Sequence, residues 1–409
     1  MFKDSEFSPR RLFARFPPGI WAVTVLGFLN AAGFSISLPF LSLYLYQDRK
    51  MDMVLVGVVM LVAGLFSAVT QLLAGAIADR VGRRPLLLAT LFAGILLYLV
   101  MALLIGASAG LLAIVAAYTA VRCVLMMMRP AMTAIVVDLS PKERLTETYG
   151  LLRIATNLGW AAGPAAGGYL ASSLSYAWLF ALTGAIGIIA LLVTFLFLPE
   201  SFGQPSEKVS VGSVFNAASD RSFLKFVGLN LLVFVVASQM ISTLSVFTVD
   251  RGGFSPSAYG LLLTINGLVV VLLQYPASRA IGRVSKYTAL SLGSLLYGLG
   301  YLMMGWVGAF SVAAAAMVVI TLGEIIWSPT TLAVVGELSP QDSRGRYMGF
   351  FGLSDTIGVS IGPMLGGALL DVFPTRPILI WGSISILAVL AAAGFRLADG
   401  SRRARVAVR

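Results

Sequence analysis

Twelve long apolar stretches constrain this chain more than any other feature of its sequence. Each is close to the roughly 20 apolar residues that an α-helix needs to cross a bilayer. Only 11% of the residues are charged, against about 25% in soluble domains. In lipid, backbone polar groups must be satisfied within the spanning segment, which favours helices. The sequence therefore predicts an all-α membrane protein with twelve transmembrane helices.

The apolar stretches fall into two sets of six. The first set spans about 20–46, 54–78, 86–105, 111–138, 145–171 and 176–198. The second spans about 222–249, 258–280, 287–307, 311–337, 347–370 and 377–398. The one long polar connection inside the chain lies between the sets and is typical of a linker. We therefore expect an N-terminal six-helix bundle over 1–198, a cytoplasmic linker over 199–221 and a C-terminal six-helix bundle over 222–409.

Lys and Arg residues are concentrated in every second loop. With the N-terminus inside, the inner segments hold 22 of the 29 Lys and Arg residues, and the outer loops hold four: Arg49, Lys50, Arg251 and Arg376. Cytoplasmic loops carry an excess of Lys and Arg, so both termini are predicted to be cytoplasmic and the protein to be multi-pass in the cell inner membrane. The same rule accounts for the net charge of +11 without a nucleic-acid partner.

The composition also limits the chemistry. The chain has no histidine and one cysteine, Cys123, so an intrachain disulfide and His-based metal sites are excluded. Proton transfer then has to use carboxylates. P-loop and H-E-x-x-H motifs are absent from the sequence. We therefore expect no enzyme activity, no ATP-driven transport within this chain, and no metal or cofactor.

Three motifs recur in register between the two sets. Gly57, Gly64 and Gln71 recur 203 positions later. Asp138-Leu-Ser-Pro recurs 199 positions later as Glu337-Leu-Ser-Pro, and Gly163-Pro-x-x-Gly-Gly recurs at the same offset. A duplication of six helices produces this pattern, with a binding site expected at the midplane between the halves. The two bundles are therefore predicted to be pseudo-symmetric.

The loop after the second stretch reads GAIADRVGRRP over 75–85. It resembles the G-x-x-x-D-R-x-G-R-R signature loop of the major facilitator superfamily. The resemblance implies a latch that holds the cytoplasmic side closed, formed by Gly75, Asp79, Arg80, Gly82, Arg83 and Arg84. Asp79 is expected to face a helix N-terminus of the other half, with Arg83 as its partner. The second copy has Gly282 in place of Asp79, so the latch should be one-sided; the simpler interpretation is a basic loop that only sets topology.

The fifth stretch carries Gly159, Gly163, Pro164, Gly167 and Gly168 in the pattern G-x-x-x-G-P-x-x-G-G. It resembles the motif that marks antiporters within the superfamily. Glycines at i, i+4 and i+8 make a smooth face for close helix contact. The eleventh stretch repeats the pattern, so part of the signal is duplicated architecture.

The tenth stretch contains Thr321-Leu-Gly-Glu-Ile. It resembles a segment of multidrug efflux members whose Glu is protonated during transport. The resemblance covers essentially the whole chain and points to the twelve-helix drug:proton antiporters. One departure concerns the family's helix-four motif, which places an Arg followed by Gln-Gly further from the acidic end of the helix. Here Arg122 precedes Asp138 by 16 positions and is followed by Cys-Val-Leu-Met, which leaves its role open.

Each ionisable residue inside the membrane needs a structural or functional explanation, because it raises the free energy of membrane insertion by about 3 kcal/mol. Glu324 is the most interior acid and the first candidate for proton coupling, since a desolvated carboxyl favours its protonated form. Its alternative role is that of a structural partner for Arg122 or Arg153. Asp355 and Asp138 are second candidates, and Asp138 is equally compatible with an interfacial charge.

Polar stripes on two helices predict a cavity, because polar stripes that face lipid are untenable. One stripe is Arg122, Met126 and Arg129, and the other is Arg153, Asn157 and Trp160. The other candidates for the substrate cavity are Asn30, Phe34, Gln239, Asn266 and Trp327. Met and aromatic side chains suit varied apolar ligands because they re-pack, although the same residues are common in ordinary helix packing.

These features predict a secondary active transporter, a proton-coupled antiporter that exports amphiphilic drug-like compounds by alternating access. Its expected partners are a small-molecule substrate, protons and membrane lipid, and we expect a monomer. The alternative is proton-coupled uptake or exchange of a specific metabolite such as a sugar, a peptide or an organic anion, the last favoured by the three intramembrane arginines. A non-transporting membrane sensor with the same fold is the hypothesis from a different class.

Overall fold

The computed structural model describes residues 16–141, 144–201, 215–281, 284–340 and 343–407, and within these residues it contains helices and no strands. The first six long helices are α2 (Pro18–Gln47), α3 (Met53–Val81), α4 (Arg83–Gly106), α5 (Leu111–Leu139), α6 (Leu145–Ser173) and α7 (Tyr176–Phe197). After η2 (Phe215–Ser219), an interrupted helix runs through α9 (Arg221–Ala237), η3 (Ser238–Met240), α10 (Thr243–Val246) and η4 (Phe247–Arg251). The last five are α11 (Pro256–Ile281), α12 (Lys286–Met304), α13 (Phe310–Leu338), α14 (Arg344–Val372) and α15 (Pro377–Ala407).

The predicted fold class is confirmed. Twelve long helical segments, counting 221–251 as one, match the twelve predicted stretches to within a few residues at most ends. Ten of the helices in the described ranges are long and apolar enough to cross a membrane. The other two, α6 and α12, carry glycines that pack closely on neighbouring helices, such as Gly163 against α2 and Gly300 against α13.

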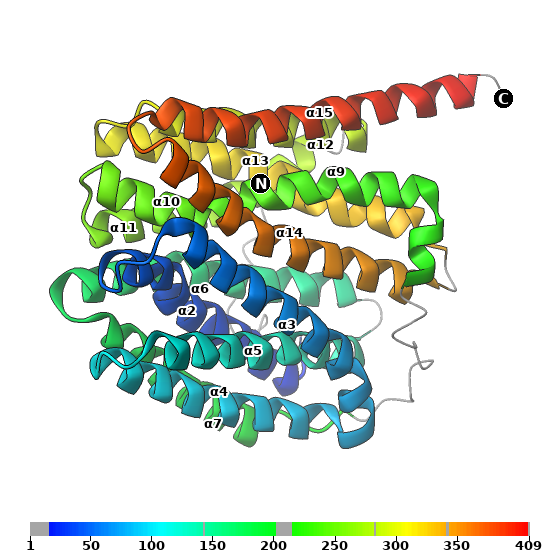
Figure 1. The fold of residues 1–409 in the computed structure, drawn as a ribbon. Coiled ribbons are helices and arrows are strands. Elements are labelled where there is room, and N and C mark those ends of the chain that lie inside the picture. Colours follow the sequence, from blue (N-terminus) through cyan, green and yellow to red (C-terminus); the bar gives the residue numbers. More distant parts are fainter. Residues whose placement is uncertain (1–15, 142–143, 202–214, 282–283, 341–342, 408–409) are drawn as a thin grey trace, which may run out of the picture.

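The helices group into two bundles in Figure 1, with α2–α7 in the lower one and α9–α15 in the upper one. We call these the first half and the second half. The predicted division of the chain at 199–221 stays a prediction, because residues 202–214 lie outside the described part of the chain. Asp220 caps the helix that begins the second half, accepting hydrogen bonds from Ser222 N at 2.8 Å and Phe223 N at 3.1 Å, as Asp does at helix N-termini.

The predicted helix over 222–249 is broken near Ser238, where α9 gives way to short 3₁₀, α and π turns. Hydroxyl side chains in this segment compete with backbone N–H groups for hydrogen bonds to backbone carbonyls. Ser238 Oγ donates to Val235 O at 2.9 Å, and Ser245 Oγ donates to Ser242 O at 2.6 Å. Ser and Thr hydroxyls offer the backbone this alternative to regular helix. The dense run of polar residues over 238–245 therefore explains the break, which hydrophobicity alone did not reveal.

The bundle has two ends that differ in charge. The basic end carries the turns that join α3 to α4 and α11 to α12, and the opposite end carries the turns that join α2 to α3 and α14 to α15. The predicted placement of the basic end and both termini in the cytoplasm stays a prediction.

The halves meet along two seams, α3 against α14 and α6 against α11. The repeated glycines lie in these seams. A Cβ added to Gly57 would lie 2.5 Å from Met364 N, and one added to Gly267 would lie 2.6 Å from Ala161 Cα. Such distances mean that backbone packs directly on backbone. The repeat in the sequence therefore marks the contact surface between the halves.

The glycine motif of α6 packs inside the first half. Cβ atoms added to Gly159 and Gly163 would lie 2.5 and 2.7 Å from carbonyl oxygens of α2. Only Gly168, at the end of the motif, faces α11 across the seam. The copy in α14 does the same, since Gly358 and Gly362 pack on α9 and η3. The predicted close-packing face is confirmed. Because the motif packs in the same way in both halves, we interpret it as part of the duplicated scaffold.

Candidate functional site

Glu324 lies on α13 near the seam between α6 and α11, in a small polar network. Asn266 Nδ2, on α11, donates to Glu324 Oε2 at 2.8 Å and contacts Thr321 Oγ1 at 3.0 Å. Thr321 is one turn away from Glu324 on α13. The side chain of Asn266 is buried, so its amide fixes the carboxyl in place. A carboxylate held this way accepts a strong hydrogen bond when ionised.

A cation from the first half faces this network across the seam. Arg153, on α6, interacts electrostatically with Glu324, and its Nη2 donates to Gln274 Oε1 of α11 at 2.7 Å. Gln274 Nε2 in turn donates to Ile325 O at 3.0 Å. One side chain of α11 thus links Arg153 to the backbone of α13 beside Glu324. Arg153 therefore lies within electrostatic range of Glu324, and whether Glu324 is a coupling residue or a structural partner of Arg153 stays a prediction.

A second set of charged side chains includes residues from both halves. Asp355, on α14, lies within electrostatic range of Arg129 and Arg122 of α5. The Arg122 Nε atom is buried and has no hydrogen-bond partner among the described residues. A buried guanidinium donor without a partner costs free energy.

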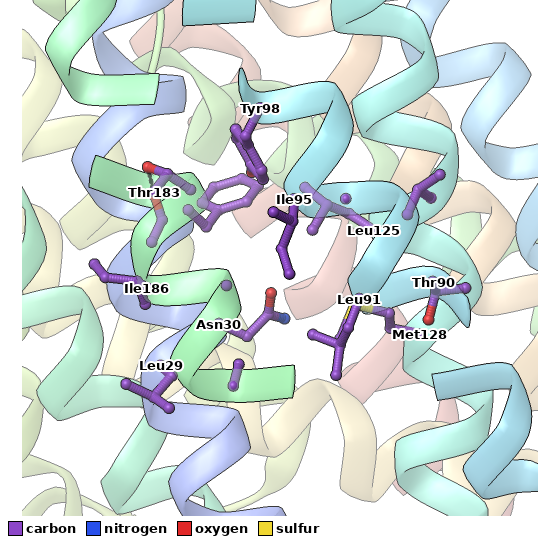
Figure 2. A pocket seen from close by; sticks show the side chains of 16 residues that line it. Leu29, Asn30, Thr90, Leu91, Ile95, Tyr98, Leu125, Met128, Thr183 and Ile186 are labelled. Carbon is purple, nitrogen blue, oxygen red and sulfur yellow. Dashed lines mark hydrogen bonds between the residues drawn. The ribbon is translucent and has the colours of Figure 1, made fainter. Parts of the chain in front are cut away.

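Asn30 and Phe34 line a small cavity within the first half, bounded by α2, α4, α5 and α7. Figure 2 shows the Asn30 amide extending toward the centre of this cavity, among apolar side chains such as Leu91, Ile95 and Leu125. Phe34 also packs on Trp160, with ring centroids 5.4 Å apart. The two residues thus share one cavity whose walls belong to a single half, and their place in a substrate cavity stays a prediction.

Gln239 and Trp327, which were predicted to line the substrate cavity, are engaged in packing inside the second half. Gln239 is fully buried, and its amide nitrogen donates to Val235 O at 2.8 Å and Gly362 O at 2.9 Å. Trp327 is 5% exposed and packs edge-on against Phe234 at 5.1 Å. We leave both out of the proposed site, because Gln239 is hydrogen-bonded to backbone and both side chains pack inside the second half. Asn157 and Met126 are partly exposed and stay predictions.

The signature loop at the basic end forms a tight turn as expected, because Gly82 adopts a φ of 98°, which favours glycine. Glu200 accepts from the backbone nitrogens of Arg83 at 3.2 Å and Arg84 at 3.4 Å. Its carboxylate therefore stabilises the first turn of α4. The surroundings of Gly75 and the side chain of Asp79 lie outside the described part, so the latch to the other half stays a prediction.

Arg83 forms an ion pair with Asp138 at the end of α5. The second half has the equivalent pair, Lys286 with Glu337, at the matching positions of α12 and α13. Because the pair is present in both halves, it belongs to the duplicated scaffold. Asp138, predicted as a second-rank coupling residue, therefore has a structural role, and we do not include it in the proposed coupling site.

The two ion pairs differ in burial, which predicts unequal stability effects. We expect Asp138→Ala to cost about 2 kcal/mol, because it removes the charged partner of Arg83, only 9% exposed, which keeps its hydrogen bond to Ala134 O. Glu337→Ala should cost under about 1 kcal/mol, since the Lys286 side chain is 43% exposed and exposed pairs contribute little. Thermal unfolding of the purified variants compares the two, and an equal fall in both midpoints would contradict the burial argument.

Some members of the site were missed by the sequence reasoning. Gln274 appeared only as a repeat position equivalent to Gln71, yet it makes the hydrogen bond across the α6–α11 seam. Gln71 lies at the corresponding place in the other seam, 3.5 Å from Thr356 Oγ1. The repeat was therefore the signal that could have found them, because residues kept in both halves lie at the contact between the halves.

Comparisons with known proteins agree with this architecture. The profile of the Major Facilitator Superfamily matches residues 23–255 and 227–408. The chain is 24% identical over 367 residues to a Na(+), Li(+), K(+)/H(+) antiporter of Planococcus maritimus, covering 82% of this chain and 86% of the relative. It is 23% identical over 376 residues to the quinolone resistance protein NorA of Staphylococcus aureus, covering 89% and 92%. Among solved structures, a POT family transporter in complex with 5-aminolevulinic acid matches with a TM-score of 0.78 and 17% identity, over 92% of this chain and 95% of that one.

The chain belongs to the Major Facilitator Superfamily. It is a multi-pass membrane transporter and not an enzyme, in agreement with the sequence-based expectation.

Proposed function

We propose that this transporter is a proton-coupled antiporter that exports amphiphilic, drug-like compounds by alternating access. The observation that carries the proposal is Glu324, a carboxyl inside the bundle that is hydrogen-bonded by Asn266 and faced by Arg153 from the other half. The resemblance to a quinolone resistance protein and to a proton-linked antiporter supports the substrate class and the coupling.

The geometry suggests how a proton changes the contact between the halves. Ionised Glu324 is stabilised by Arg153 while the α6–α11 seam is closed, because opposite charges compensate each other in a poorly solvated site. Protonated Glu324 needs no counter-charge, so proton binding weakens one tie across the seam. Substrate and proton can then exclude each other, if an amphiphilic cation takes the place of the proton beside the carboxylate.

The membrane placement belongs to the same proposal. The basic end faces the cytoplasm of the cell inner membrane, because it carries most of the Lys and Arg residues. The seams are closed toward the opposite end, where α3 meets α14 beside Val54 and Asp371. With this placement, the end that the Val54–Asp371 contact holds together faces the outside.

The proposal is tested by Glu324→Gln in vesicles with an imposed pH gradient. The variant keeps the shape of the side chain and a hydrogen-bond acceptor for Asn266 but cannot exchange a proton. We expect gradient-driven substrate movement to fall at least about tenfold, while exchange of substrate without a gradient continues. The control is Glu337→Gln, which removes an exposed acid from the same helix. Undiminished gradient-driven movement in the Glu324 variant would sink the assignment.

A second candidate is proton-coupled transport of an organic anion, supported by the buried Arg122 Nε that lacks a partner among the described residues. Arg122 and Arg129 both face Asp355, so a carboxylate substrate could replace Asp355 as their partner. A narrow substrate range that is lost in Arg122→Gln and unaffected by amphiphilic cations would favour this candidate. Broad recognition of cationic dyes would favour export of drug-like compounds.

A further inference from the structure

The opposite end of the bundle contains two helix N-termini that are capped from the other half. Asp371, at the end of α14, accepts a hydrogen bond from Val54 N at the start of α3, with Oδ2 3.0 Å away. Ser172, at the end of α6, accepts from Ser257 N at the start of α11, with Oγ 3.1 Å away. Each cap therefore joins the two halves at the outer end of one seam.

The two caps are equivalent under the internal repeat. Ser172 and Asp371 are 199 positions apart and Val54 and Ser257 are 203 positions apart, the same offsets as those of the repeated motifs. Ser42 and Ser245, also 203 apart, hydrogen-bond each other at 3.0 Å. Residues related by the repeat can meet only on the pseudo-two-fold axis, so the axis passes between these two serines.

We propose that these two cross-half caps lock the opposite end closed, one on each side of the axial Ser42–Ser245 contact. The first four N–H groups of a helix have no partner within the helix, and a side-chain cap satisfies one of them. Here the cap belongs to the other half, so opening this end removes the cross-half cap from both helix N-termini, while Ser255 Oγ still accepts from Ala258 N at 3.1 Å at the start of α11. The lock is charged on the α3 side and neutral on the α11 side.

The charge difference gives the caps different chemistry. The Asp371 carboxylate interacts with the dipole of α3 as well as with Val54 N, whereas Ser172 provides a hydroxyl that also donates to Gly168 O at 2.6 Å. Asp371→Asn removes the charge and keeps an acceptor oxygen, while Asp371→Ala removes both. Opening should therefore become easier in the order Asp371→Asn, then Asp371→Ala.

The test measures how often the opposite end opens, from the reactivity of a thiol placed beneath the lock. The only native cysteine, Cys123, is first replaced by Ala. Ser245→Cys then puts a thiol at a fully buried position on the axis. Its rate of reaction with a charged maleimide reports the population of the open form when opening is fast. Ser294→Cys, at a position fully buried within the second half, is the reporter for general loosening.

We expect Asp371→Ala and Ser172→Ala each to raise the reaction rate of the Ser245→Cys reporter about three- to fivefold. This factor corresponds to the free energy that is lost when a helix cap is removed. Asp371→Asn should fall between wild type and Asp371→Ala. Asp48→Ala, which removes an exposed acid from a turn at the same end, should leave the rate unchanged. An unchanged rate in either alanine variant, or an equal rise in the Ser294→Cys reporter, would overturn the lock. The experiment measures no transport, so its failure leaves the proposed proton coupling untouched.

Discussion

Gly57→Ala is expected to abolish transport almost completely by preventing closure of the opposite end. The added Cβ would lie 2.5 Å from Met364 N and 2.7 Å from Pro363 O, and both atoms belong to backbone that cannot rotate away. Overpacking of a tight contact costs about 1–3 kcal/mol. That cost applies only while α3 and α14 touch, so it shifts the equilibrium toward the state in which they have separated.

The measurement is substrate uptake by vesicles, and we expect a loss of more than about tenfold, which corresponds to a shift above about 1.4 kcal/mol. The matched control is Gly336→Ala on α13, where an added Cβ meets nothing within 4 Å. Because Gly336→Ala improves helix propensity, it should be neutral or slightly stabilising. Equal activity of the two variants would show that the seam does not need close backbone contact.

Removing the charges of Arg153 and Glu324 one at a time and then together is expected to show strong coupling between the halves. Arg153→Gln leaves Glu324 without its counter-charge, and Glu324→Gln leaves Arg153 beside a neutral amide. Each single variant should therefore lower the unfolding midpoint, while the double variant recovers part of the loss. Contacting residues show interaction energies of about 0.5–3 kcal/mol in such cycles.

Transport assays on the same variants distinguish a loss of stability from a loss of proton coupling. The double variant should regain thermal stability but not gradient-driven transport, because it still lacks the titratable carboxyl. The matched cycle pairs Arg153→Gln with Glu337→Gln, whose partner is Lys286, and its effects should add. Additive effects of Arg153 and Glu324 would mean that the two side chains do not act on each other.

Much of the fold was predictable because lipid imposes a simple rule. Helix number and approximate bounds followed from apolar length. The glycines repeated between the halves, Gly57 and Gly64 with Gly260 and Gly267, lie in the seams. Close helix contact requires residues without side chains, so the repeat recorded where the halves touch.

The partners of individual polar side chains were not predictable in the same way. Arg83 pairs with Asp138, 55 positions along the chain, a partner that the sequence did not indicate, while its expected pairing with Asp79 stays a prediction. Gln239 was expected in a cavity and instead bonds to Gly362 O. Such pairs depend on how helices cross and rotate, which hydrophobic periodicity does not determine. Residue spacing gives a helical face, but the neighbour of that face comes from the tertiary structure.

The central claim is that protons move against substrate through Glu324. The most direct measurement is the internal pH of proteoliposomes loaded with the amphiphilic cation ethidium and diluted into dye-free buffer, with the membrane potential clamped. Antiport predicts that ethidium leaving the lumen drives protons inward, so that the lumen acidifies with the wild-type protein and not with Glu324→Gln. A lumen that keeps its pH, becomes alkaline, or acidifies equally in the variant would contradict the account.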